Sequence, residues 1–156
     1  MDQRAPLEVG ICVRDLEGMI AFYRDVLGLT YISTFEVPPH KSAPAGFAVE
    51  GYTIVRLQTP FGERIKLVKP GSDGPARERD NDVLGRQGAA FFTYIVADLP
   101  AMVSRLKAAG AEPMTEGEHL EVRKGVHLCN LRDPEGNFIE IVAYDDVTEY
   151  RDDLTR

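Results

Sequence analysis

Three charged residues, Glu8, Lys66 and Glu140, stand in short runs where apolar and polar residues alternate. Such alternation is typical of a strand, whose successive side chains point to opposite faces of a sheet. If the aliphatic residues next to them in each strand face a core, the three charged side chains lie on the opposite face of the sheet. A carboxylate can remove a proton from a carbon beside a carbonyl group, and an ammonium can stabilise the resulting enolate oxygen or return a proton. We therefore predict Glu8, Lys66 and Glu140 as catalytic groups.

The same alternation places further side chains on this polar face, where they could contact a substrate. They are Arg64, Phe91, Thr93, Phe138 and Cys12. Arg64 could steer a carboxylate or phosphate, or be a solvated arginine at a strand end. Phe91 suits a wall of the site. Cys12 has no evident basic partner, so a small packing residue is an alternative for it.

The strands that carry these residues belong to an internal repeat. Residues 13–16, Val-Arg-Asp-Leu, recur as Val-Ala-Asp-Leu at 96–99, and each copy is followed by apolar residues at helical spacing. Asp15 and Asp98 stand where helix N-caps belong. The helices are predicted to end at glycines, Gly28 and Gly110.

A second pair of signals closes each copy. Thr-Pro-Phe-Gly at 59–62 and Asp-Pro-Glu-Gly at 133–136 are turn sequences, and each precedes an alternating run, at 64–68 and 138–142. Each copy has room for two more strands between its helix and its last strand. We expect these at about 30–36 and 46–58, and at about 112–122 and 125–132.

The sequence thus predicts an α+β fold of two tandem β-α-β-β-β modules, which form a curved mixed sheet around a shared cleft. The first module spans 5–68 and the second spans 89–143. The polar, Gly- and Pro-rich segment 69–88 is the expected linker. The last segment, 144–156, is expected to be an acidic tail that is partly disordered.

The overall composition excludes several classes of protein. The net charge of −7 argues against nucleic acid as a partner. No apolar run has the roughly 18 residues that a membrane span needs. The two cysteines form no CxxC pair, which favours reduced thiols and a cytoplasmic location.

The segments 13–16 with 21–29, and 133–137 with 139–142, resemble the vicinal oxygen chelate superfamily, which includes glyoxalases, epimerases, extradiol dioxygenases and bleomycin resistance proteins. The resemblance covers about residues 7 to 143. It implies a small-molecule substrate, and a homodimer is a frequent arrangement among such proteins. Its enzymes usually hold a divalent metal with one side chain from each opening and each closing strand.

Carried over to this sequence, the four metal-ligand places are Glu8, Lys66, Phe91 and Glu140. A lysine ammonium and a phenyl ring have no lone pair for a metal. We therefore expect no metal and no cofactor, with Lys66 supplying the positive charge. The expected activity is that of a metal-independent isomerase or epimerase acting on a small enolisable carbonyl compound.

Three alternatives remain open from the sequence. The charged residues could be a structural salt-bridge cluster between the modules. The chain could be a binding protein of the drug-resistance type, which holds its ligand unchanged. It could also be a metal-dependent lyase or dioxygenase with an unusual ligand set, such as Glu8, Glu140 and His127. His40 lies in the Pro-rich loop and is expected to be a surface histidine, with a place in a lid over the cleft as the alternative.

Overall fold

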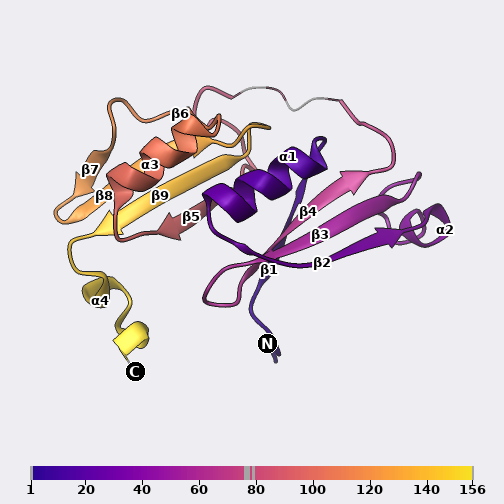
Figure 1. Ribbon diagram of the computed structural model, residues 1–156, viewed down its shortest axis with the longest axis horizontal. Coiled ribbons are helices and arrows are strands. Elements are labelled where there is room, and N and C mark those ends of the chain that lie inside the picture. The colour runs from indigo at the N-terminus through magenta and orange to yellow at the C-terminus, as the bar shows by residue number, and fades with distance from the viewer. Residues whose placement is uncertain (1, 76–77, 79, 156) are drawn as a thin grey trace. The chain divides into compact units, whose positions relative to one another are not determined.

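The computed structural model describes residues 2–75, 78 and 80–155, and it divides into two compact units, Met1–Ala76 and Arg77–Arg156 (Figure 1). The division falls inside the predicted linker. Residues 76, 77 and 79 of that linker lie outside the described residues. Each unit contains its own mixed sheet. The predicted α+β class and the β-α-β-β-β order of the modules are confirmed.

The first unit has a four-stranded sheet in the order β1-β4-β3-β2. Its strands are β1 (Glu8–Cys12), β2 (Thr30–Val37), β3 (Tyr52–Gln58) and β4 (Arg64–Pro70). Strand β1 runs parallel to β4, and the remaining pairs are antiparallel. The register pairs Glu8 with Arg64 and Gly10 with Lys66, so the polar positions of β1 and β4 share a face.

The helix of the first unit changes its type halfway. Helix α1 (Leu16–Ala21) continues as a π-helical turn, η1 (Phe22–Val26), in which the Leu27 amide donates to the Phe22 carbonyl. Asp15 caps the start, as predicted, because its carboxylate accepts a hydrogen bond from the Gly18 amide. Gly28 follows the helix with a φ of 86°, the left-handed backbone that favours glycine.

The second unit repeats the arrangement. Strand β5 (Phe91–Ile95) runs parallel to β9 (Phe138–Tyr144), which pairs with β8 (Val126–Arg132). Helix α3 (Leu99–Ala108) begins at Asp98, whose carboxylate accepts from the Ala101 amide. Short strands β6 (Glu112–Pro113) and β7 (Leu120–Arg123) both pair with β8.

Three segments differ from their sequence-based prediction. The strand expected at about 112–122 is split into β6 and β7, because Pro113 lacks an amide hydrogen and Gly117 turns the chain with a φ of 76°. The strand expected at about 46–58 starts only at Tyr52, after a short helix α2 (Pro39–Ser42) and a loop. The tail contains helix α4 (Val147–Tyr150) and a 3₁₀ turn, η2 (Asp152–Thr155).

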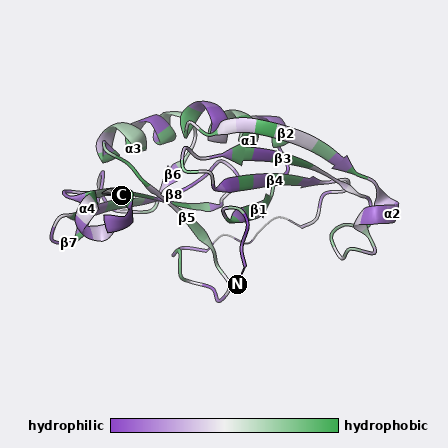
Figure 2. Ribbon diagram, turned by 90° about the horizontal axis from the view of Figure 1, so that it is seen from below, coloured by the Kyte–Doolittle hydropathy of each residue, from purple (hydrophilic) through white to green (hydrophobic). Residues whose placement is uncertain are grey.

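In both units the core lies between the sheet and its helix. Apolar and polar positions alternate along β3 and β4 (Figure 2), and the residues between the polar ones are buried. Fully buried side chains include Tyr23, Leu57 and Leu67 in the first unit, and Leu106, Leu131, Ile139 and Ile141 in the second. No helix within the described residues is long and apolar enough to cross a membrane.

Candidate functional site

Glu8 lies at the centre of a cluster of cations on the sheet of the first unit. Its carboxylate is 3.2 Å from Arg64 Nη1, 3.7 Å from Lys66 Nζ and 3.7 Å from Arg56 Nε. We call these four residues the Glu8 cluster. The strand register explains the contacts, because Arg64 is opposite Glu8 and Arg56 is opposite Lys66. About 30% of each of these side chains is exposed, so solvent and a ligand can reach them.

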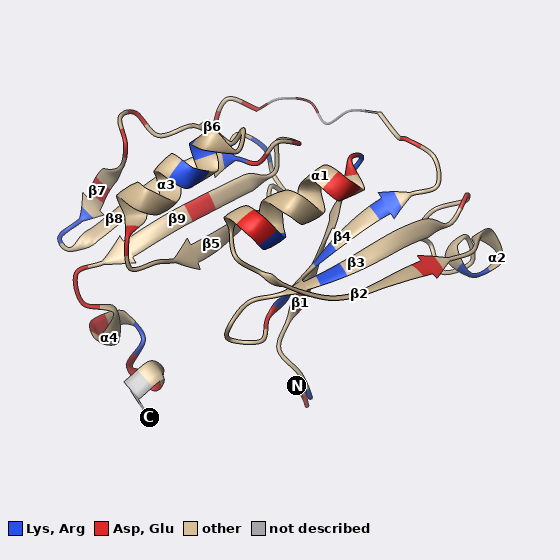
Figure 3. Ribbon diagram, in the orientation of Figure 1, with Lys and Arg blue, Asp and Glu red and all other residues tan. Residues whose placement is uncertain are grey.

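Arg56 is the member of the Glu8 cluster that the sequence-based prediction missed. It lies between Val55 and Leu57, which are both buried, so the alternation in β3 puts it on the polar face. Its guanidinium carbon lies 4.9 Å from the centre of the Phe35 ring, which is 50% exposed. With three cations and one carboxylate, the Glu8 cluster has a net charge of +2. Figure 3 shows these basic positions on β3 and β4.

A hydrogen bond to Gln58 helps to hold Arg64 within the Glu8 cluster. Arg64 Nε donates to Gln58 Oε1 at 2.8 Å, while Arg64 Nη1 donates to Glu8. The Arg64 side chain is therefore held between two acceptors at the start of β4. A fixed guanidinium is suited to binding an anionic group.

Glu140 lies on the sheet of the second unit, where its environment contrasts with that of Glu8. Its Oε2 accepts a hydrogen bond from Thr93 Oγ1 at 2.6 Å, across the parallel pair of β5 and β9. Among the described residues, no cation forms an ion pair with Glu140. The predicted trio is thus divided: Glu8 and Lys66 are in contact in the first unit, and Glu140 is paired with Thr93 in the second. Its action together with them stays a prediction.

The other predicted contacts have different environments. Phe91 is 42% exposed and lines a pocket with Thr93 and Glu140, as a substrate wall would. Cys12 is exposed on its strand and forms no disulfide. Phe138 is only 2% exposed, although the alternation in β9 places it on the face of Glu140. The guanidinium of Arg132, its neighbour on β8, lies 5.9 Å from its ring centre.

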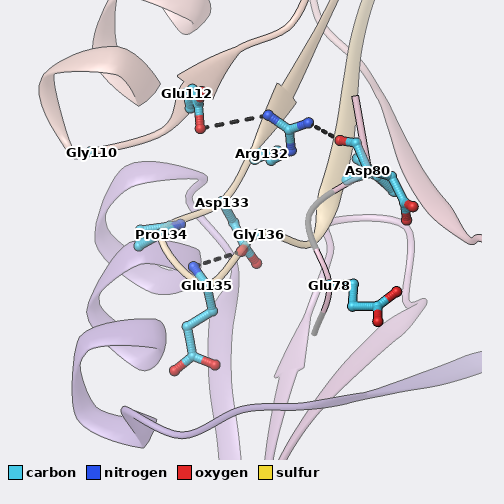
Figure 4. Close-up of a pocket in the computed structure, with 10 residues that line it drawn as sticks. Glu78, Asp80, Gly110, Glu112, Arg132, Asp133, Pro134, Glu135 and Gly136 are labelled. Carbon is cyan, nitrogen blue, oxygen red and sulfur yellow. Dashed lines mark hydrogen bonds and ion pairs between the residues drawn. The ribbon is translucent and has the colours of Figure 1, made fainter. Parts of the chain in front are cut away.

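Arg132 also belongs to a second hollow, of about 280 Å³, at the end of β8 (Figure 4). It donates to the Asp80 carbonyl and forms an ion pair with Glu112 at 3.6 Å. The adjacent Asp133 accepts hydrogen bonds from the amide of Glu135 and from the amide and side chain of Asn137. These contacts fix the Asp-Pro-Glu-Gly turn and thereby the start of β9, which carries Glu140.

The Tyr94 hydroxyl is a buried polar group on the helix side of β5. It has no hydrogen-bond partner among the described residues. Burial, followed by the nearby charge of Asp133, raises the pKa of Tyr94 well above that of an exposed tyrosine. This hydroxyl therefore stays protonated and is a poor candidate for proton transfer at neutral pH.

The donor groups do not fit the divalent metal that the family resemblance implies. Lys66 and Phe91 occupy two of the four expected ligand places, and Lys66 is instead in contact with Glu8. His127 Nε2 lies 3.8 Å from Asp145 and its ring is 5.5 Å from that of His119. Its partners are therefore at the edge of the second unit, and nothing places it beside Glu8 or Glu140. No three His, Cys, Asp or Glu side chains of the described chain come together as a metal site.

The chain is similar to several solved structures. A glyoxalase family protein from Bacillus cereus is 25% identical, with 92% of this chain and 96% of that chain covered and a TM-score of 0.77. The trypanothione-dependent glyoxalase I of Leishmania major is 20% identical, with 98% and 95% covered and a TM-score of 0.66. A glyoxalase/bleomycin resistance/dioxygenase domain from Frankia is 17% identical, with 91% and 92% covered and a TM-score of 0.66. The similarities to the Leishmania major and Frankia proteins show a shared fold alone.

Among curated protein sequences, none matched the chain. The family model described as Glyoxalase/Bleomycin resistance protein/Dioxygenase superfamily matches residues 6–141. That range includes the first sheet, the second sheet up to Ile141 in β9, helices α1 and α3, and every residue of the Glu8 cluster. The chain therefore belongs to the glyoxalase/bleomycin resistance protein/dioxygenase superfamily, the vicinal oxygen chelate group.

Proposed function

We propose that the protein is a metal-independent isomerase or epimerase that acts by proton transfer on a small, anionic, enolisable carbonyl compound. The observation that carries this proposal is the contact of 3.7 Å between the Glu8 carboxylate and the Lys66 ammonium, beside two arginines. A general base and an electrophile must both lie within reach of one substrate. The Glu8 cluster meets this requirement on a single rigid sheet.

In the proposed reaction, Glu8 takes the proton from the carbon next to the carbonyl group. The electron pair of the broken C–H bond forms a C=C double bond, and the π pair of the carbonyl group moves onto its oxygen, which gives an enolate. The Lys66 ammonium stabilises this oxygen, and a proton then returns to the carbon from Lys66. Removing one such acid or base typically slows a reaction by about 10²- to 10⁴-fold.

The surplus positive charge of the Glu8 cluster supports an anionic substrate. Arg64 is fixed by Gln58 and Glu8, and Arg56 lies over the exposed Phe35 ring. A carboxylate or phosphate on the substrate can replace Glu8 as the partner of one arginine. This change of ion-pair partner would also release the Glu8 carboxylate to act as a base.

The test is the exchange of solvent deuterium into the substrate. The purified chain is incubated in D₂O with a panel of carboxylate-bearing ketones, 2-oxo acids and thioesters, and loss of the C–H signal is followed by ¹H NMR. We expect at least one compound to exchange above the blank rate, and Glu8→Gln to slow this exchange by at least about 100-fold.

Glu36→Gln provides the matched control, because it removes the same charge from an exposed position on β2 of the same sheet. Its exchange rate should equal that of the wild type. Exchange that survives in Glu8→Gln would overturn the proposal. So would a ligand that binds the chain and is recovered without deuterium, which is the result expected of a binding protein of the drug-resistance type.

A further inference from the structure

The second unit contains a pocket of about 480 Å³ on the sheet face that carries Glu140. This volume lies within the range of small-molecule sites. Strands β5, β8 and β9 form the floor, and residues of the C-terminal segment, Tyr150 and Arg151, form part of the wall. Helix α4 follows directly from the end of β9 (Figure 1). The segment predicted as a partly disordered tail is thus part of a pocket.

Specific contacts hold this C-terminal wall in place. Asp146 caps α4 by accepting hydrogen bonds from the Thr148 amide at 2.8 Å and from its hydroxyl at 2.6 Å. The rings of Tyr144 and Tyr150 are stacked, with centres 4.6 Å apart and planes 12° from parallel. Tyr150 therefore packs on Tyr144, the last residue of β9, and the Tyr150 ring lines the pocket.

The residues lining the pocket are divided by chemical type. Glu140 is the acidic group, and its single hydrogen bond among the described residues comes from Thr93. Aromatic and aliphatic side chains surround it, namely Phe91, Ile95, Val126, Leu128, Val142, Tyr144 and Tyr150. Two arginines, Arg123 and Arg151, add positive charge, and the Arg123 guanidinium lies 6.0 Å from the Tyr144 ring centre.

We propose that this pocket binds an aromatic compound with a hydrogen-bond donor at one end and an anionic group at the other. The donor binds Glu140 and the ring packs against Phe91 and Tyr150. The anion lies beside Arg123, because Arg151 already donates two hydrogen bonds to Asp153. Tyr150 is then a specificity-determining residue supplied by the C-terminal segment. This proposal does not rest on the proposed function, because the Glu8 cluster belongs to the first unit and the residues that line this pocket belong to the second.

The test uses 4-hydroxybenzoate as the probe, because its phenol hydroxyl and its carboxylate lie at opposite ends of one aromatic ring. Binding to the ¹⁵N-labelled full chain is followed by ¹H–¹⁵N NMR. We expect the amides of 91–95, 140–144 and 150–151 to shift. Tyr150→Ala should weaken binding about fivefold, the value of one aromatic pair, while Tyr150→Phe retains it.

The matched control is Phe47→Ala, since Phe47 is an aromatic residue of the first unit that is 71% exposed. Its substitution should leave probe affinity unchanged. The assignment is overturned if the probe shifts amides around Phe35 and Phe47 instead, if Tyr150→Ala binds as tightly as the wild type, or if no binding occurs. Probe binding without deuterium exchange in any carbonyl compound would remove the proposed function alone. Exchange without probe binding would remove this pocket alone.

Discussion

Removing the charge of Glu8 should destabilise the first unit, because it leaves three cations together. At 3.2–3.7 Å, each ion pair is worth roughly 4–5 kcal/mol of Coulomb energy at an effective dielectric constant of about 20. Solvent screening and side-chain entropy reduce the net value of such partly exposed pairs to about 0.2–1 kcal/mol each. For the three pairs, we expect Glu8→Gln to lower the free energy of unfolding by about 1–2 kcal/mol.

Urea unfolding followed by far-UV circular dichroism measures this cost, since the chain has no tryptophan. The measurement is made at 0.1 M and at 1 M NaCl, where the screening length falls from about 10 Å to about 3 Å. We expect the cost to shrink by at least about half at the higher salt concentration. Glu36→Gln, which removes a charge outside the Glu8 cluster, should change stability by less than about 0.5 kcal/mol.

Either of two results would contradict an electrostatic role of Glu8 in stability. If Glu8→Gln lowers the free energy of unfolding equally at both salt concentrations, the Glu8 side chain stabilises the unit through packing and not through its charge. No cost at all would mean that the three cations do not depend on Glu8. A double-mutant cycle with Arg64→Gln would then locate the error, because the 3.2 Å pair should show the largest coupling.

Three further predictions concern buried groups of the second unit. Because the pKa of Tyr94 is raised in the folded state, its stabilising contribution is present below about pH 10 and is lost as pH rises. Tyr94→Phe should therefore reduce the loss of thermal stability above pH 10, and an unchanged alkaline slope would contradict this. Burial likewise raises the pKa of Cys129, so iodoacetamide at pH 8 should label Cys12 in the native chain and Cys129 only after unfolding, as mass spectrometry can test. Asp133→Ala, which removes the acceptor of three hydrogen bonds, should cost about 3 kcal/mol in urea unfolding, whereas Asp82→Ala at an exposed position should cost almost nothing.

The strands and their faces followed from the sequence because alternation is a local property. Glu8 and Lys66 were predicted on one face, and their side chains are in contact. Arg56 follows the same rule, but the strand expected at about 46–58 was too long and its faces were not assigned. The loop before Tyr52 depends on Gly51, whose φ of 78° ends the alternation.

Other features depended on contacts between distant parts of the chain. Alternation gives the face on which Phe138 lies but not what covers it, and Arg132 lies beside its ring. The place of Tyr150 likewise depends on its stacking with Tyr144. The π-helical turn after Ala21 departs from the regular helix that the apolar spacing predicted, because that spacing does not distinguish hydrogen-bond types.

In the proposed reaction, Lys66 supplies the positive charge that a metal would supply in related enzymes. Deuterium exchange tests this role when protein dialysed against a chelator is compared with the same protein after addition of Mg²⁺, Mn²⁺, Ni²⁺ or Zn²⁺. We predict that exchange persists at the undialysed rate, that no metal increases it, and that Lys66→Met abolishes it. Exchange that is lost on dialysis and restored by a metal would contradict the claim.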